Sequence, residues 1–240
     1  MTEVLRFDRI GSTQTEANRR AAAGDPPGTT IVALRQEMGR GRADHRWFAP
    51  VGGLYLSRIE VDPGGPIELL PMAIAVGLAT WLERVHRVRC RLRWPNDLWV
   101  SAPPGKIAGI LAERVIGPHG PRLVVGIGVN VESDLAEFPE EIRSEVAVLR
   151  DRADGDVSLP ATETAVLHAL ADALRRVGSS EGSAGIVHEA AGRLEGIGRS
   201  VTLDGVPVGR LVGLDATGAL VTESGGARRT HLAGTLRFLP

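Results

Sequence analysis

The sequence predicts a mixed α and β fold in which a larger N-terminal domain is followed by a small β-barrel. Apolar runs of strand length alternate with helix-length segments over most of the chain. From about Gly196 onward, short β-rich pieces lie between glycine turns. The composition, 43% hydrophobic and 24% charged over 240 residues, is that of a globular protein long enough to bury a core.

The N-terminal part predicts alternating strands and helices. In chain order we expect a strand at Val4–Ile10, a helix at Gln14–Ala23, strands at Thr29–Leu34 and Leu54–Val61, and a helix at about Glu68–Val85. Ser12 or Thr13 is placed to cap the first helix, and Gly24 to end it. The polar, glycine-bearing stretch Gln36–Arg46 is too hydrophilic for the core.

The second half continues this pattern and then changes. We expect strands at Arg89–Arg93, Leu98–Val100, Lys106–Ile116 and Leu123–Val131, a helical region from Pro139 to Val177, a flexible break at Gly178–Gly185, and strands at Ser200–Leu203, Val206–Leu214, Ala219–Glu223 and Thr230–Phe238. Asp204-Gly205 between apolar runs is a strong hairpin signal. We therefore expect one domain at residues 1–192 and a small one at 193–240.

Charge and cysteine content limit the function. The net charge is −1 and the isoelectric point is about 6.6, so no global field attracts DNA or an anionic membrane. A single cysteine, Cys90, excludes an intramolecular disulfide and is typical of a reducing compartment. Without a signal peptide or a membrane-length apolar run, the expected location is the cytoplasm.

Lysine is almost absent. Of the 28 lysine and arginine residues, only Lys106 is a lysine. A coding bias toward arginine explains this composition without any functional meaning. The alternative is that position 106 needs a compact ammonium that a planar guanidinium cannot replace. Composition alone leaves both interpretations open.

The segment Gly39-Arg40-Gly41-Arg42 is the most unusual motif. Glycines let the backbone approach a ligand, and arginines between them offer forked donors for phosphate or carboxylate oxygens. The motif indicates an anion-binding loop, with an exposed basic turn as the alternative. Trp47, a few residues later, either stacks on a base or packs in the core.

Three further segments have weaker signals when each is taken alone. Trp94-Pro95-Asn96-Asp97 is typical of an ordinary turn. Lys106–Glu113 is a predicted strand that begins with the lone lysine, and Gly126–Asn130 is a predicted strand that contains two glycines. Asn130 offers a donor and an acceptor suited to an adenine edge. The six histidines lack metal-ligand spacing, and no Walker A, G-x-S-x-G or G-x-G-x-x-G motif follows a strand.

Together, these segments resemble the biotin protein ligases in type, order and spacing. The resemblance covers about residues 4–132 and rests on Gly11–Thr13, on Gln36 with Gly39–Arg42 and Trp47, on Trp94–Asp97, on Lys106–Glu113 and on Gly126–Asn130. It implies an α+β fold, with a mixed sheet and flanking helices like those of class II aminoacyl-tRNA synthetases. It also implies that the C-terminal β-domain is SH3-like.

The resemblance implies an ATP-dependent ligase. Such an enzyme joins biotin to ATP, giving biotinyl-5′-AMP and pyrophosphate, and passes biotin to a lysine in the biotin carboxyl carrier domain of an acyl-CoA carboxylase. It uses Mg²⁺, whose ligands the sequence does not identify. Because Met1 nearly adjoins the first predicted strand, we expect a monofunctional enzyme without a DNA-binding domain, and neither DNA nor a membrane as partner. The sequence does not distinguish a monomer from a homodimer.

Residue roles follow by motif. The resemblance implies that Ser12, Thr13 and Gln36 hold the ureido ring of biotin, that Gly109 and Leu111 line its pocket, that Gly39, Arg40 and Arg42 surround its carboxylate and the phosphates, and that Trp47, Asn96 and Asn130 contact the adenylate. Arg40 guards the adenylate, Lys106 is the essential lysine, and Asp97 is the partner of the acceptor amine. Attack of one anion on another needs fixed cations, which Lys106 and the loop arginines supply.

The chain departs from the family pattern at three places. Gln14 replaces a common asparagine, with an effect expected only on the helix start, and Arg93 replaces a lysine. After G-R-G-R, Asp44 and His45 stand where glycine and arginine are common, so adenylate retention is weakened unless Arg46 substitutes. Two alternatives stay open: a ligase for lipoate or another acyl acid on the same fold, and a non-catalytic binder of biotin or its adenylate.

Overall fold

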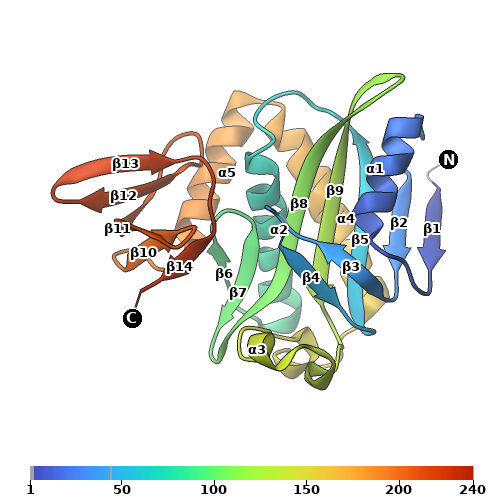
Figure 1. Cartoon of the computed structure of the whole chain (residues 1–240), viewed down its shortest axis with the longest axis horizontal. Coiled ribbons are helices and arrows are strands. Elements are labelled where there is room, and N and C mark those ends of the chain that lie inside the picture. The colour runs from blue at the N-terminus through green and yellow to red at the C-terminus, as the bar shows by residue number, and fades with distance from the viewer. Residues whose placement is uncertain (1–2, 44, 240) are drawn as a thin grey trace.

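In the computed structural model, which describes residues 3–43 and 45–239, the larger part of the chain is built on one seven-stranded sheet (Figure 1). Its strand order is β1-β2-β5-β9-β8-β7-β6. The strands are β1 (Val4–Phe7), β2 (Thr30–Ala33), β5 (Gly53–Val61), β6 (Cys90–Arg93), β7 (Asp97–Ser101), β8 (Pro104–Gly117) and β9 (Gly120–Asn130). The pair β1 and β2 is parallel and the other pairs are antiparallel, which confirms the predicted mixed sheet.

Helices cover the two sheet faces unequally. Helix α2 (Leu69–His86) packs with α4 (Leu159–Val177) and α5 (Ser180–Arg193), and buries strand residues such as Val125 and Ile127. Helix α1 (Thr13–Ala23) lies on the opposite face, where Ala17 and Ala21 pack against Val124. Since successive strand residues point to opposite faces, Val124 and Val125 face different layers. Beyond α1, this second face is crossed by a hairpin of β3 (Gln36–Arg40) and β4 (Arg46–Ala49) (Figure 1).

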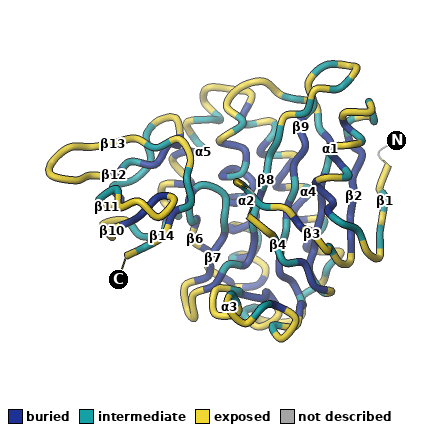
Figure 2. The backbone as a smooth tube through the Cα atoms, viewed as in Figure 1, coloured by how far each residue is buried: buried dark blue, intermediate teal, exposed yellow. Residues whose placement is uncertain are grey.

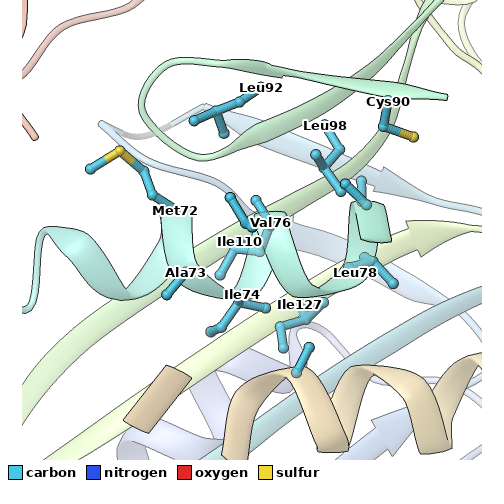
Figure 3. Packing of buried hydrophobic residues seen from close by; sticks show 14 of the residues in the cluster. Met72, Ala73, Ile74, Val76, Leu78, Cys90, Leu92, Leu98, Ile110 and Ile127 are labelled. Carbon is cyan, nitrogen blue, oxygen red and sulfur yellow. The ribbon is translucent and has the colours of Figure 1, made fainter. Parts of the chain in front are cut away.

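Helix α2 is the centre of the hydrophobic core. It is apolar nearly all round because the sheet covers one side and α4 and α5 the others. Figure 3 shows Met72, Ile74 and Val76 of this helix among Leu92 and Ile110 of the sheet. The buried segments of the tube in Figure 2 follow this layer through the middle of the molecule. Among the described residues, no helix combines the length and the hydropathy needed to cross a membrane.

The C-terminal part is a five-stranded antiparallel sheet of order β13-β12-β11-β10-β14. Its strands are β10 (Ser200–Leu203), β11 (Val206–Leu214), β12 (Leu220–Ser224), β13 (Ala227–His231) and β14 (Leu236–Phe238). The Asp204-Gly205 hairpin is confirmed, and both residues have the positive φ, 50° and 80°, that a two-residue turn of this type requires. The prediction of one strand over Thr230–Phe238 is wrong, because Gly234, with φ of 140°, separates β13 from β14.

Of two predictions in the helical region, one is wrong and the other holds only in part. The supposed break at Gly178–Gly185 lies mostly inside α5, because Ser179 caps the helix and its buried face, which includes Ile186, outweighs the glycines. The region from Pro139 to Val177 is not continuously helical. It contains α3 (Glu140–Arg143), a 3₁₀ turn at Leu149–Asp151 and then α4, which Ser158 caps.

The barrel and the large sheet share one hydrophobic core. Leu203 and Leu220 of the barrel belong to the same buried cluster as the residues of α2. At the junction the indole Nε1 of Trp94 donates a hydrogen bond to the carbonyl oxygen of Gly218 at 3.0 Å, and Arg93 pairs with Glu195 at 2.8 Å. The division at residues 192 and 193 stays a prediction.

The Trp94 bond yields a prediction for stability. Replacing Trp94 with Phe should lower the free energy of unfolding by about 1–3 kcal/mol, because the buried carbonyl of Gly218 loses its partner. Urea unfolding followed by circular dichroism measures this change. The control is Trp81→Phe on α2, whose indole is only half-buried. Equal stabilities of the two variants would show that the Trp94 bond contributes nothing specific.

Candidate active site

Three glycines leave a strip of the sheet without side chains on the face that α1 only partly covers. Gly109 of β8 lies opposite Gly128 of β9, and Leu111 lies opposite Gly126. The strip continues to Asp97 on one side of Gly109. A cavity of about 480 Å³ opens over this strip.

The cavity brings together nearly all the residues that the sequence predicted for the site. The lining includes Ser12, Thr13, Gln36, Arg40, Arg42, Trp47, Asn96, Asp97, Lys106, Gly109, Leu111 and Asn130. Gly39 is not part of the lining. A Cβ at Gly39 would lie 2.5 Å from the carbonyl oxygen of Trp47, so this glycine permits close pairing of β3 and β4 instead.

One end of the cavity is polar and uncharged. The side-chain oxygen of Gln36 accepts hydrogen bonds from the backbone N–H of Thr13 at 2.7 Å and from its hydroxyl at 3.1 Å. The hydroxyl of Ser57 lies 2.9 Å from that of Thr13. Ser12, Thr13 and Ser57 are all buried, so these groups face the cavity in a defined arrangement.

The expectation that Gln14 affects only the helix start is wrong. Gln14 is buried, lines the cavity, and its side-chain oxygen lies 3.1 Å from the hydroxyl of Ser57. A Cβ at Gly126 would collide with its carboxamide, so the glycine and the longer amide fit together. The position of Gln14 at the start of a helix obscured this role, because the sequence does not show that the first turn of α1 faces the cavity.

The Glu113 carboxylate, on β8, ties α1 to the glycine-arginine loop. It accepts hydrogen bonds from Gln14 and Asn18, each at 2.8 Å, and pairs with Arg40 at 3.1 Å. Burial acts to raise the pKa of Glu113, but these amide donors and the Arg40 charge outweigh burial and hold it below its usual value. Arg40 is therefore fixed in position at the cavity wall.

Lys106 and Asp97 form an ion pair at the other end of the strip. Lys106 Nζ lies 2.6 Å from Asp97 Oδ2, and the two side chains are 29% and 23% exposed. Asp97 Oδ1 is buried and has no hydrogen-bond partner among the described residues. The ammonium also lies 5.2 Å from the centre of the Trp47 ring.

Trp47 lies flat on the glycine strip. A Cβ would approach its ring to 2.6 Å at Gly128 and to 3.0 Å at Gly109, so the ring occupies the space that other residues would fill. Its buried Nε1 has no partner within the described part of the chain. The indole thus covers the glycine strip and offers a ring face and an Nε1–H donor that the described residues leave free.

The two predicted asparagines are mostly engaged within the protein. Asn130 Nδ2 donates to the carbonyl oxygens of Lys106 and Ala147, so of its predicted donor and acceptor only Oδ1, which no described group contacts, is free. Asn96 Nδ2 donates to Ile110 and its Oδ1 accepts from Arg42 at 3.3 Å. Asn96 therefore fixes β8 and the loop arginine in place.

The loop after Gly39 turns back tightly. The N–H of Gly41 donates to the carbonyl oxygen of His45, and the His45 ring contacts the carbonyl oxygen of Arg42 at 2.9 Å. Burial lowers the pKa of Arg42, which the charges of Asp97 and Asp204 partly offset. Arg46, the expected substitute, donates to the carbonyl oxygen of Glu37. Asp44 lies outside the described residues.

Sequence reasoning missed several parts of the cavity. Ser57 was detectable as a lone polar residue at an inward position of an apolar strand. Residues 233–237 and Asp204 also line the cavity, although they belong to the barrel. The Asp204 carboxylate accepts a hydrogen bond from the N–H of Thr235 at 2.8 Å and so holds this loop. No local pattern reveals that a distant hairpin reaches the site.

Comparison with known proteins identifies the family. A family model described as biotin/lipoate A/B protein ligase matches residues 6–130, and the chain belongs to this family. The structure of biotin protein ligase from Aquifex aeolicus in complex with biotin and ATP has a TM-score of 0.85 at 26% identity, with 100% of both chains covered. This agreement confirms the α+β fold with a mixed sheet, flanking helices and an SH3-like C-terminal domain.

Two curated relatives are also similar. The bifunctional ligase/repressor BirA of Bacillus subtilis (strain 168) is 28% identical over 229 residues, which are 92% of this chain and 69% of that protein. The protein of the same description from Bacillus spizizenii is 32% identical over 154 residues, 62% of this chain. That match spans 46%, about half, of the relative.

Glu113 gives a prediction for pH dependence. Because its pKa is lowered in the folded state, its stabilising contribution is fully present above the unfolded value of about 4.5 and is lost as pH falls through the lower folded value. Glu113→Gln should lower the free energy of unfolding by about 1–2 kcal/mol at neutral pH. Urea unfolding of both proteins should show this difference shrinking below pH 4.5. A difference that is constant with pH would contradict the role of the charge.

Proposed function

We propose that this protein is an ATP-dependent biotin ligase, which activates biotin as biotinyl-5′-AMP and transfers it to a lysine of a biotin carboxyl carrier domain. The observation that carries the proposal is the polarity of the single continuous cavity. One end offers the hydroxyls and carboxamides near Thr13 and Gln36, and the other offers the cations Lys106 and Arg42. A biotin molecule has the matching polarity, with a cyclic urea at one end and a carboxylate at the other.

The polar end suits the urea ring. Its carbonyl requires donors and its two N–H groups require acceptors, and the hydroxyls of Ser12, Thr13 and Ser57 supply both. Gln36 and Gln14 complete this end. Lipoate carries an apolar five-membered ring that contains two sulfur atoms. This ring would leave the buried polar groups without hydrogen-bond partners. This difference favours biotin over lipoate.

The cationic end suits the first reaction. A carboxylate oxygen of biotin attacks the α-phosphorus of ATP, and pyrophosphate leaves. Both reactants are anionic, so fixed positive charge lowers the barrier. Lys106, held by Asp97, and Arg42, held by Asn96, are positioned before the substrate arrives. The resulting adenylate would place its adenine near Trp47, with Asn130 Oδ1 as an acceptor for the amino group.

The second reaction needs a proton acceptor for the incoming lysine. Asp97 Oδ2 is engaged with Lys106, whereas Oδ1 is buried and has no partner in the described ranges. In the proposed reaction this oxygen receives a proton from the acceptor amine as that amine attacks the acyl carbon and AMP leaves.

Magnesium has no evident protein cage. Among residues 3–43 and 45–239, no three His, Cys, Asp or Glu side chains gather as a metal site. Mg²⁺ commonly keeps several waters and binds through substrate phosphates. We therefore treat it as part of the Mg-ATP substrate and assign no residue to it.

Ligand-dependent exchange of pyrophosphate into ATP tests the proposal, with biotin and lipoate in parallel. Exchange with biotin alone is expected, because only the urea ring satisfies the buried polar groups. Exchange with lipoate alone would replace biotin by lipoate as the substrate. Binding of biotin without exchange would instead indicate a non-catalytic binding protein, the remaining alternative.

Gly128→Ala tests the position of the adenine. The new Cβ would lie 2.6 Å from the Trp47 ring, so the ring must move from the strip. We expect the affinity for ATP in the presence of biotin to fall roughly tenfold, or about 1.4 kcal/mol. The matched control is Gly213→Ala in β11, where the added Cβ meets open space. Calorimetric titration that shows the same ATP affinity for both variants would contradict a contact between adenine and Trp47.

A further inference from the structure

The proposed function creates a chemical hazard at Lys106. An acyl adenylate is a mixed anhydride that reacts with primary amines, and Lys106 is a primary amine in the cavity that would hold it. This inference therefore rests on the proposed adenylation. If the amine lost its proton, its nitrogen would attack the acyl carbon of the adenylate. An amide would form at Lys106, the bond from the acyl carbon to the phosphate oxygen would break, AMP would leave, and the amine proton would pass to solvent.

Lys106 is also the only side-chain amine in the protein. The other 27 of the 28 lysine and arginine side chains are arginine guanidiniums. Guanidiniums stay protonated and are poor nucleophiles for an acyl group. Self-acylation of a side-chain amine therefore has a single possible site. That site is Lys106, which lines the cavity where the adenylate would form.

The geometry around Lys106 opposes this reaction. Asp97 Oδ2 lies 2.6 Å from Nζ and stabilises the ammonium, which has no lone pair to attack with. The Trp47 ring, 5.2 Å from Nζ, adds a second contact that favours the cation. Gly109 lies beside both partners, and a Cβ there would be 3.2 Å from Lys106 Cε and 3.3 Å from Asp97 Oδ1. The pair is thus seated directly on the sheet.

We propose that Asp97 is a positioning residue that holds the Lys106 side chain in a close ion pair and so protects the enzyme from acylation by its own adenylate. The two oxygens of this carboxylate then have different tasks. Oδ2 engages the resident amine at 2.6 Å, whereas the free, buried Oδ1 accepts a proton from the visiting one. One residue thereby distinguishes the lysine that must not react from the lysine that must.

The first experiment measures the reactivity of Lys106 without any adenylate. Wild type, Asp97→Asn and Asp97→Asn/Lys106→Arg are treated with N-hydroxysuccinimidyl acetate, and acetylation is followed by peptide mapping, which separates Lys106 from the N-terminal amine. Asp97→Asn should acetylate at Lys106 several-fold faster than wild type. The double variant should gain no side-chain acetyl group. Equal rates for wild type and Asp97→Asn would overturn the proposal, provided that circular dichroism shows both to be folded.

The second experiment uses the adenylate itself. The same proteins receive synthetic biotinyl-5′-AMP, so that the variants need not perform the first reaction, and binding is confirmed by calorimetry. Wild type should stay unmodified at Lys106, whereas Asp97→Asn should gain one amide-linked biotin there, as peptide mapping would show. Acylation of wild type at Lys106 at the rate of Asp97→Asn would overturn the proposal. If wild type neither exchanges pyrophosphate nor binds the adenylate, the proposed function fails instead, and the acetylation rates still decide whether Asp97 shields Lys106.

Discussion

The site depends on a strip of sheet that carries no side chains. Gly109 and Gly128 are paired across β8 and β9, and Gly126 lies two residues away on β9 opposite Leu111, so part of an otherwise filled sheet lacks bulky side chains. Without this strip the Trp47 ring could not pack against the sheet, and the β3–β4 hairpin that carries it could not cross the sheet so closely. The opposite face of the same strands is packed with aliphatic side chains against α2, which keeps the strip rigid. Binding surface and core are thus two sides of one pair of strands.

Two ion pairs border this strip and fix its charges. The pair of Glu113 and Arg40 connects the glycine-arginine loop to α1. The pair of Asp97 and Lys106 fixes the ammonium between the starts of β7 and β8. Each of these two cations keeps a carboxylate partner, whereas Arg42 is held by the carboxamide of Asn96. An incoming anion meets cations that are already oriented and need little reorganisation. The cost is that phosphate must compete with these carboxylates for the same donors.

The sequence predicted the strands of the large sheet, the principal helices and the main polar and charged residues of the cavity, because these depend on local signals. Apolar periodicity marked the sheet, and the glycine-arginine loop and the lone lysine marked the charged end. It failed where tertiary contacts decide. Glycines in α5 suggested a break, yet the buried face around Ile186 holds the helix. Gln14 looked like a helix-start residue, and only the packing of α1 over Gly126 shows that it reaches the site. The role of Glu113 gave no local signal, because its partners come from two segments distant in the sequence, α1 and β3.

The barrel is more than a neighbour of this site. Its loop at residues 233–237 lines the cavity, and the Arg237 guanidinium lies 3.6 Å from the Glu145 carboxylate of the large domain. The negative charge of Asp204 acts to raise the pKa of Arg42. The same barrel shares a core with α2 and receives the hydrogen bond of Trp94, two residues before Asn96. A shift of the barrel would therefore change both the cavity wall and the turn that positions Asn96 and Asp97. A boundary that is clear in the composition of the sequence is thus not a boundary of the site, and the composition alone could not show this.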